Sequence, residues 1–291
     1  MSWVIYNQLD KLADDLPHFI VKLNELKALG LPSDEVMFFD NLSIVLAKAA
    51  RSISAKTPVD HVKLRLLFEN LIDLPLVKPS KWYSVLFQAL HKAFKEFDDY
   101  IEFADWWDFA NFRPEDFEKD KLPDGKEMMA LAEQAYIAYA KHLLPKQTYH
   151  GEVIFDRNKV EEFLPRLIHI AETYPTFQYP SYFQAKLLLA LGDHEDMLSA
   201  LLPFARKKRN DFWVWEILSE AFTRDEEKVF ALYCRALSCH SPEEMLINLR
   251  QKMASLLIPR QLFNEARTEI DLLVSARTAK GFRIPQIISD W

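Results

Sequence analysis

The chain has 291 residues, of which 49% are hydrophobic and 13% aromatic, and its formal net charge is −7. A chain of this length can hold one large or two ordinary domains with a sizeable core, and the composition excludes disorder as a description of the whole. The acidic balance disfavours a protein that binds nucleic acid through its overall charge, although local basic patches stay open.

The first half of the chain contains several apolar stripes with helical spacing, separated by turn residues. In the clearest stripe the apolar residues recur at intervals of four: Trp82, Leu86, Leu90 and Phe94. Such a stripe is typical of a helix face that packs into a core. The sequence therefore predicts an N-terminal helical bundle over residues 1–145, closed by Pro145.

Residues 98–120 differ in character, because acidic and aromatic side chains alternate along them. Paired carboxylates beside tryptophans would suit acid–base chemistry or a cation site. The alternative is a helix with an acidic outer face and an aromatic inner face, followed by an irregular connector that can also serve as a docking loop. The spacing matches no calcium loop or His-rich metal motif, which favours the second interpretation.

Residues 146–156 are polar, contain Gly151 and lack periodicity, so they are predicted to link two domains. The best strand candidate in the chain, residues 152–155, lies here and is short. All five glycines fall between predicted helices, where a chain often needs positive φ. The predicted fold class is all-α, with a second helical domain over residues 157–291.

A basic run precedes one predicted helix of the second domain and consists of Arg206, Lys207, Lys208 and Arg209. Trp213 and Trp215 follow at a spacing of two, which points them to different faces of that helix. Cations beside an available aromatic would bind phosphate and stack a base, or bind an acidic peptide. The interpretation that we favour places the run at the C-terminal end of a helix, where it complements the helix dipole.

Residues 211–273 contain two consecutive helix–turn–helix patterns. The first follows the N-cap residues Asn210 and Asp211, and the second opens with a predicted capping box, Ser241 to Glu244, with Pro242 at the first helical position. The apolar and small residues at intervals of three and four in these patterns are Trp215, Leu218, Ser219 and Phe222, then Val229, Tyr233 and Ala236, then Met253, Ala254 and Leu257, then Ala266, Ile270 and Leu273.

This spacing resembles the tetratricopeptide repeat, with its W-x2-L-G-x2-Y pattern followed by a small residue and apolar ones. Ser219 stands in place of the family's Gly, Arg250 stands where an aromatic is expected, and Pro242 misses the family position by one. A third unit, residues 182–208, has the right length but matches poorly. The resemblance implies stacked helix pairs whose first helices line a concave surface suited to extended peptides. In this register the groove-facing residues would be Trp213, Glu216, Glu220, Asn248, Gln251 and Ser255.

The sequence contains no Walker loop, Rossmann fingerprint, nucleophile elbow or zinc-binding His pair, and its eight histidines are scattered. We therefore expect no catalysis, no cofactor and no metal. On the resemblance, the expected function is a non-catalytic scaffold that binds a partner peptide or protein in the groove. The alternative is a nucleic-acid-associated accessory protein that uses residues 206–209 and the neighbouring aromatics.

Two cysteines, Cys234 and Cys239, have a spacing that suits neither a disulfide nor a metal site, which favours a reducing compartment. The first residues lack the basic and apolar regions of a secretion signal. No apolar run approaches the roughly 20 residues of a membrane span. We expect a soluble cytoplasmic protein.

Overall fold

The protein is all-α, as predicted. The computed structural model describes residues 2–31, 35–122, 125, 127–147 and 151–291, and for residues 203–204 it describes the backbone. About 69% of the chain is helical. The chain folds into two compact units, residues 1–143 and residues 144–291.

The first unit consists of seven α-helices and two 3-10 helices in its described part. In chain order these are α1 (Ser2–Lys11), α2 (Leu16–Ala28), α3 (Val36–Ser54), α4 (His61–Leu71), α5 (Lys81–Phe94), α6 (Tyr100–Trp107), η1 (Phe109–Asn111), η2 (Pro114–Phe117) and α7 (Leu131–Leu143).

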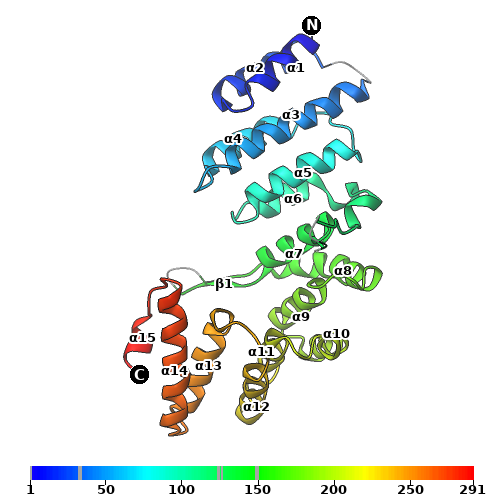
Figure 1. Ribbon diagram of the computed structural model, residues 1–291. Coiled ribbons are helices and arrows are strands. Elements are labelled where there is room, and N and C mark those ends of the chain that lie inside the picture. The colour runs from blue at the N-terminus through cyan, green and yellow to red at the C-terminus, as the bar shows by residue number, and fades with distance from the viewer. Residues whose placement is uncertain (1, 32–34, 123–124, 126, 148–150) are drawn as a thin grey trace. The chain divides into compact units, whose positions relative to one another are not determined.

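Consecutive helices of the first unit pair with each other, and the pairs stack (Figure 1). Helices α1, α3 and α5 pack in one row, while α2 packs on α4 in the other. The predicted stripe on α5 is mostly buried, since Leu86, Leu90 and Phe94 are inaccessible to solvent. Trp82 lies at the edge under the Lys81 ammonium, which is 5.1 Å from its ring.

The second unit contains two short strands, one 3-10 helix and the remaining α-helices. In chain order these are β1 (Lys146–Gln147), β2 (Val153–Ile154), α8 (Arg157–Thr173), α9 (Pro180–Leu191), α10 (His194–Lys207), α11 (Phe212–Glu220), α12 (Glu226–Leu237), η3 (Glu243–Met245), α13 (Ile247–Leu257), α14 (Phe263–Ala279) and α15 (Gln286–Ser289).

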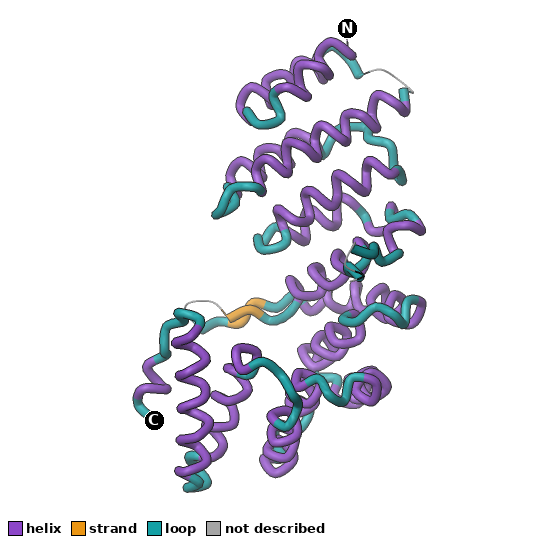
Figure 2. The backbone as a smooth tube through the Cα atoms, in the orientation of Figure 1, coloured by secondary structure: helices purple, strands orange, loops and turns teal. Residues whose placement is uncertain are grey.

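The predicted linker, residues 146–156, overlaps the start of the second unit. Strands β1 and β2 pair antiparallel there, with Lys146 opposite Ile154 and Gln147 opposite Val153 (Figure 2). Residues 148–150 of the predicted linker lie outside the described residues. Asp156 then caps α8 by accepting a hydrogen bond from the amide of Lys159 at 3.0 Å.

Antiparallel helix pairs α9–α10, α11–α12 and α13–α14 follow α8. Gly192 separates the first pair with a φ of +84°, a left-handed conformation that lets a helix end and the chain turn. The apolar core between the last two pairs includes Tyr233, Leu249 and Met253. The chain ends with α15, whose Ile288 packs into a cluster with Leu273 of α14.

The capping box predicted at residues 241–244 does not form. The segment instead makes the 3-10 turn η3, and α13 begins only at Ile247 without a side-chain cap. The carboxylates of this segment pair with distant cations instead. Glu243 pairs with Arg250, and Glu244 lies 3.4 Å from the ammonium of Lys280. Tertiary ion pairs therefore replace the local cap.

No helix in the described part of the chain is both long and apolar enough to cross a membrane.

A buried histidine links pH to the stability of the first unit. His91 is 5% exposed, and its Nδ1 lies 2.8 Å from the hydroxyl of Tyr100. Burial, with a smaller contribution from the charge of Lys95, lowers the pKa of His91 from 6.5 to about 4. Because the unfolded chain binds this proton more tightly, the contribution of His91 to stability is fully present above pH 6.5 and is lost as the pH falls towards 4.

We predict that the free energy of unfolding falls by about 1.5 kcal/mol between pH 6.5 and 5 through this group, a range in which most carboxylates stay charged. Denaturant unfolding at several pH values measures it. The variant His91→Phe should lose this slope, while His18→Gln, at an exposed histidine, should keep it. Equal slopes in the parent and His91→Phe would contradict the assignment.

Neighbouring isoleucines at the C-terminus provide a matched test of the role of α15. Ile288 is 4% exposed and Ile287 is 52% exposed. We predict that Ile288→Ala costs about 2–5 kcal/mol, as a buried large-to-small change, and that Ile287→Ala stays within about 0.5 kcal/mol. If urea unfolding gives both variants the same stability, then α15 does not cover α14 as described.

Candidate functional site

Three helices of the second unit surround one hollow, which we call the polar hollow. It has a volume of about 480 Å³ and is built from α9, α11 and α13, the first helix of each pair. Ile217 is buried, and the other lining residues are polar or aromatic. The lining residues are Tyr182, Lys186, Trp213, Glu216, Ile217, Glu220, Asn248, Gln251, Lys252 and Ser255.

All six groove-facing residues predicted from the repeat register lie in this lining. Sequence reasoning missed Tyr182, Lys186, Ile217 and Lys252. The first two belong to the unit that matched the repeat poorly, yet they are four residues apart on α9 and so share a face. Helical spacing could also have identified Lys252, because it lies one turn after Asn248 on α13.

The aromatic end of the polar hollow is formed by Trp213 and Tyr182, and Tyr179 lies beside it. The ring of Tyr182 meets Trp213 edge to face at 5.1 Å, and Tyr179 lies 6.1 Å from Trp213. The ammonium of Lys186 is 5.3 Å from the Tyr182 ring. Edge-to-face and cation–π geometry hold these half-buried side chains in place and leave part of each surface to solvent.

An ion pair crosses the hollow from α13 to α11. The ammonium of Lys252 donates to Glu216 Oε1 at 2.8 Å and lies 3.9 Å from Glu220 Oε1. Burial alone would lower the pKa of Lys252, but the hydrogen bond and charge of Glu216, with smaller contributions from Tyr233 and Glu220, raise the pKa above its usual value. Lys252 therefore stays charged at neutral pH and offsets one of the two carboxylate charges.

Arg250 explains one departure from the repeat pattern. Where the family has an aromatic, this arginine is only 7% exposed and donates to both carboxylate oxygens of Glu243 at 2.9 and 3.0 Å. Its Nη1 also donates to Glu269 of α14. A buried charge is tolerated only when it is paired in this way. The guanidinium thus joins η3, α13 and α14, a role that the apolar stripe could not reveal.

Trp215 belongs to a predicted apolar stripe but lies only partly in the core. The fully buried face of α11 is centred on Val214, Ile217 and Leu218. Trp215 is half-buried at the edge of the core, and its indole donates to the carbonyl of Arg209 at 2.9 Å. The guanidinium of Arg235 covers its ring at 5.2 Å. The indole N–H needs a partner, which keeps the ring at the surface rather than in the core.

A second hollow adjoins the first, and we call it the apolar hollow. Its volume is about 530 Å³, and Leu189 and Ala190 of α9 contribute to its lining. Lys186 and Glu220 line both hollows, so the two hollows are neighbours, and we call them together the groove. The other lining residues are Leu144, Pro145, His194 and Thr223.

The basic run lies at a different place in the unit. Arg206 and Lys207 end α10, and the ammonium of Lys208 lies 3.8 Å from the carboxylate of Asp211. The two lysines line a further hollow of about 350 Å³ together with polar residues such as Thr176 and Gln178. Lys207 and Arg209 are exposed. The helix-end position matches the favoured interpretation, since cations there complement the helix dipole.

The acidic segment, residues 98–120, forms α6, η1 and η2, with its aromatics turned inward. Tyr100, Phe103 and Trp107 are inaccessible to solvent. Asp105 accepts a hydrogen bond from the hydroxyl of Tyr139 at 2.7 Å. Asp116 is buried, where it accepts from Ser84 and from Arg113. The inward aromatics agree with the second interpretation of this segment, whereas the buried Asp116 departs from the acidic outer face that it predicts.

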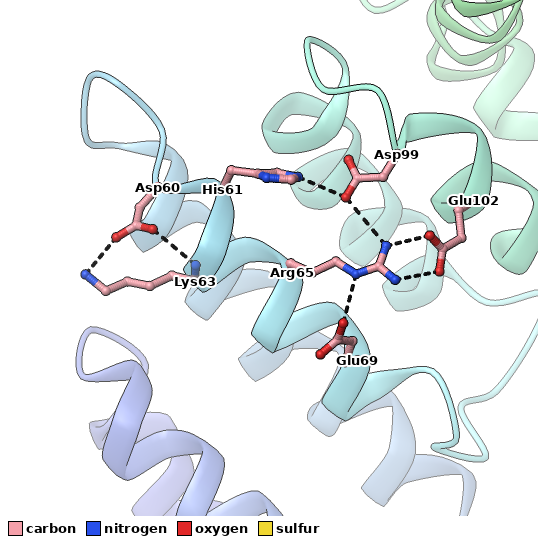
Figure 3. A network of polar contacts seen from close by, with 7 residues as sticks. All are labelled: Asp60, His61, Lys63, Arg65, Glu69, Asp99 and Glu102. Carbon is pink, nitrogen blue, oxygen red and sulfur yellow. Dashed lines mark hydrogen bonds and ion pairs between the residues drawn. The ribbon is translucent and has the colours of Figure 1, made fainter.

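Other carboxylates of α6 and its N-terminal turn join a polar network with α4 (Figure 3). Arg65 donates to both oxygens of Glu102, at 2.5 and 2.9 Å, and to Glu69 at 2.9 Å. Asp99 lies 2.9 Å from His61 Nε2. The hydrogen bond from Arg65 lowers the pKa of Glu102. The network therefore links α6 to α4. Among the residues that the structure describes, no cluster of three or more His, Cys, Asp or Glu side chains could hold a metal ion.

Comparison with known families identifies one match, over the region that holds the groove. Residues 178–291 match the model of a domain of unknown function, DUF7017. The matched region begins two residues before α9 and includes every residue that lines the polar hollow. No curated protein matches the chain.

The position of the basic run at a helix end gives a prediction for Lys207 and Lys208. Changing both to Gln should cost at most about 0.3–1 kcal/mol each in stability. Binding of a labelled oligo(dT) should be weak in the parent at physiological salt and unchanged in the variant. Tight binding that the double substitution weakens, with the slope of log affinity against log salt flattened by about 1–2, would establish phosphate contacts instead.

Proposed function

We propose that this protein is a non-catalytic interaction module that binds a partner peptide or protein in the groove of a helical-repeat region resembling tetratricopeptide repeats. The observation that carries the proposal is the lining of the polar hollow. The six residues predicted from the repeat register meet there from α11 and α13, and α9 contributes the third wall. Stacked helix pairs with a concave inner surface suit extended ligands.

The chemistry of the lining supports binding to a polypeptide. Asn248 is exposed, Gln251 is half-buried, and both lie on one face of α13. A primary amide offers a donor and an acceptor, and so can pair with a main-chain N–H and C=O whatever the partner's sequence. The partly exposed ring of Trp213 adds apolar contact area of the kind enriched at binding hot spots.

A second candidate is the nucleic-acid-associated accessory protein. The observation that favours it is the hollow at Lys207 and Lys208, where two cations meet polar side chains. Against it, Lys208 lies beside the carboxylate of Asp211, and the whole chain is acidic. We favour the interaction module because its residues come from three helices and enclose a larger hollow.

Selection from a displayed library of random eight-residue peptides on the full chain tests the proposal. Enriched peptides should bind the parent and lose about tenfold in affinity on the double variant Asn248→Leu/Gln251→Leu, since two hydrogen bonds of about 0.5–1.5 kcal/mol each are removed at nearly constant volume. Asn264→Leu removes an exposed amide from α14, outside the hollow, and should leave binding unchanged. Enriched peptides that bind all three proteins equally would contradict the proposed function.

A further inference from the structure

The groove contains a cation with no carboxylate partner among the described residues. The ammonium of Lys186 is held over the Tyr182 ring, and this cation–π contact is its one polar interaction with the part of the chain that the structure describes. Lys186 is half-buried and lies where the polar and apolar hollows meet. A half-buried cation interacts more strongly with a carboxylate than a fully solvated one, because less water screens the pair.

The two carboxylates of the groove share one ammonium, which offsets one of their two charges. Lys252 donates to Glu216 and lies within 3.9 Å of Glu220. A cation on a partner would have to compete with Lys252 for these glutamates, whereas a carboxylate on a partner would meet Lys186 without displacing any ion pair. Because Lys186 has no carboxylate partner among the described residues, we expect the junction of the two hollows to favour an acidic group over a basic one.

An apolar surface lies next to Lys186 on the same face of α9. Leu189 and Ala190 follow it by three and four residues and line the apolar hollow with Leu144 and Pro145. On a helix this spacing corresponds to a rise of about 4.5–6 Å. In an extended chain, side chains two residues apart point to the same side and are separated by about 6.6 Å. An acidic residue and an apolar residue two positions apart match the two features.

We propose that the groove takes an extended, internal peptide segment in which Asp or Glu lies two positions from Leu, Ile, Val or Met. The carboxylate pairs with Lys186, and the apolar side chain enters the apolar hollow. Asn248 and Gln251 hold the main chain of the segment. This inference rests on the proposed function and adds the chemical class of the partner.

The sequences enriched in the peptide selection test this pairing. On the parent, enriched peptides should carry an acidic residue two positions from an apolar one more often than the starting library. Selection on Lys186→Gln should lose the acidic preference and keep the apolar one. Lys207→Gln, which removes an exposed lysine outside the groove, should keep both preferences.

A double-mutant cycle with one synthetic peptide measures the strength of the proposed pair between the peptide carboxylate and Lys186. The peptide is acetylated and amidated, so its only carboxylate is the selected side chain. Fluorescence anisotropy should show about fivefold weaker binding to the parent when that Glu is changed to Gln, as for a charge pair of about 1 kcal/mol. On Lys186→Gln the two peptides should bind equally.

The outcomes separate the inference from the proposed function. Peptides that depend on Asn248 and Gln251 but show no acidic preference, or keep it on Lys186→Gln, would overturn the inference and leave the groove as the binding site. Enriched basic peptides would also overturn the inference, because their cations would pair with Glu216 and Glu220. Peptides that bind the parent and the double variant Asn248→Leu/Gln251→Leu equally well would overturn both the inference and the proposed function.

Discussion

The candidate site depends on the ion pairs of one buried guanidinium, that of Arg250. Removing a charge from water costs several kcal/mol, and ion pairs with good hydrogen bonds are needed to offset that cost. Arg250 meets that requirement by donating to Glu243 of η3 and Glu269 of α14. These ion pairs hold α13 against η3 and α14. The apolar cluster that contains Leu249 and Met253 determines which face of α13 is buried. The opposite face, with Asn248, is then held towards the groove.

The groove stays open because its walls cannot collapse onto each other without burying polar groups. Ile217 is a buried apolar side chain of the lining, whereas amides, carboxylates and ammonium groups form most of the walls. A hydrogen bond of 2.8 Å between Lys252 and Glu216 links α13 to α11 across the groove. A polar cleft of this kind is stable in water and gains most from a ligand that supplies matching hydrogen bonds and charge.

The helical class could be predicted from the sequence, because helical periodicity fixes which side chains share a face. The convergence of the groove residues was expected from the resemblance to the tetratricopeptide repeat. Asn248 and Gln251 are examples of positions that follow from the register of that resemblance. What spacing cannot supply is a partner distant in the chain. The capping box at Glu244 failed since Lys280 attracts its carboxylate, and Arg250 occupies an aromatic position since two glutamates compensate it. Trp215 stays at the surface because its indole bonds to a backbone carbonyl.

The most direct test of the account is to map where a selected peptide binds the full chain in solution. We predict that the side-chain amide NMR signals of Asn248 and Gln251 and the indole signal of Trp213 shift on titration, while that of Trp215 stays in place. Saturating shifts confined to the backbone around Thr176 and Lys207, with the Asn248 and Gln251 amides unmoved, would contradict the claim that the groove of α9, α11 and α13 is the binding site.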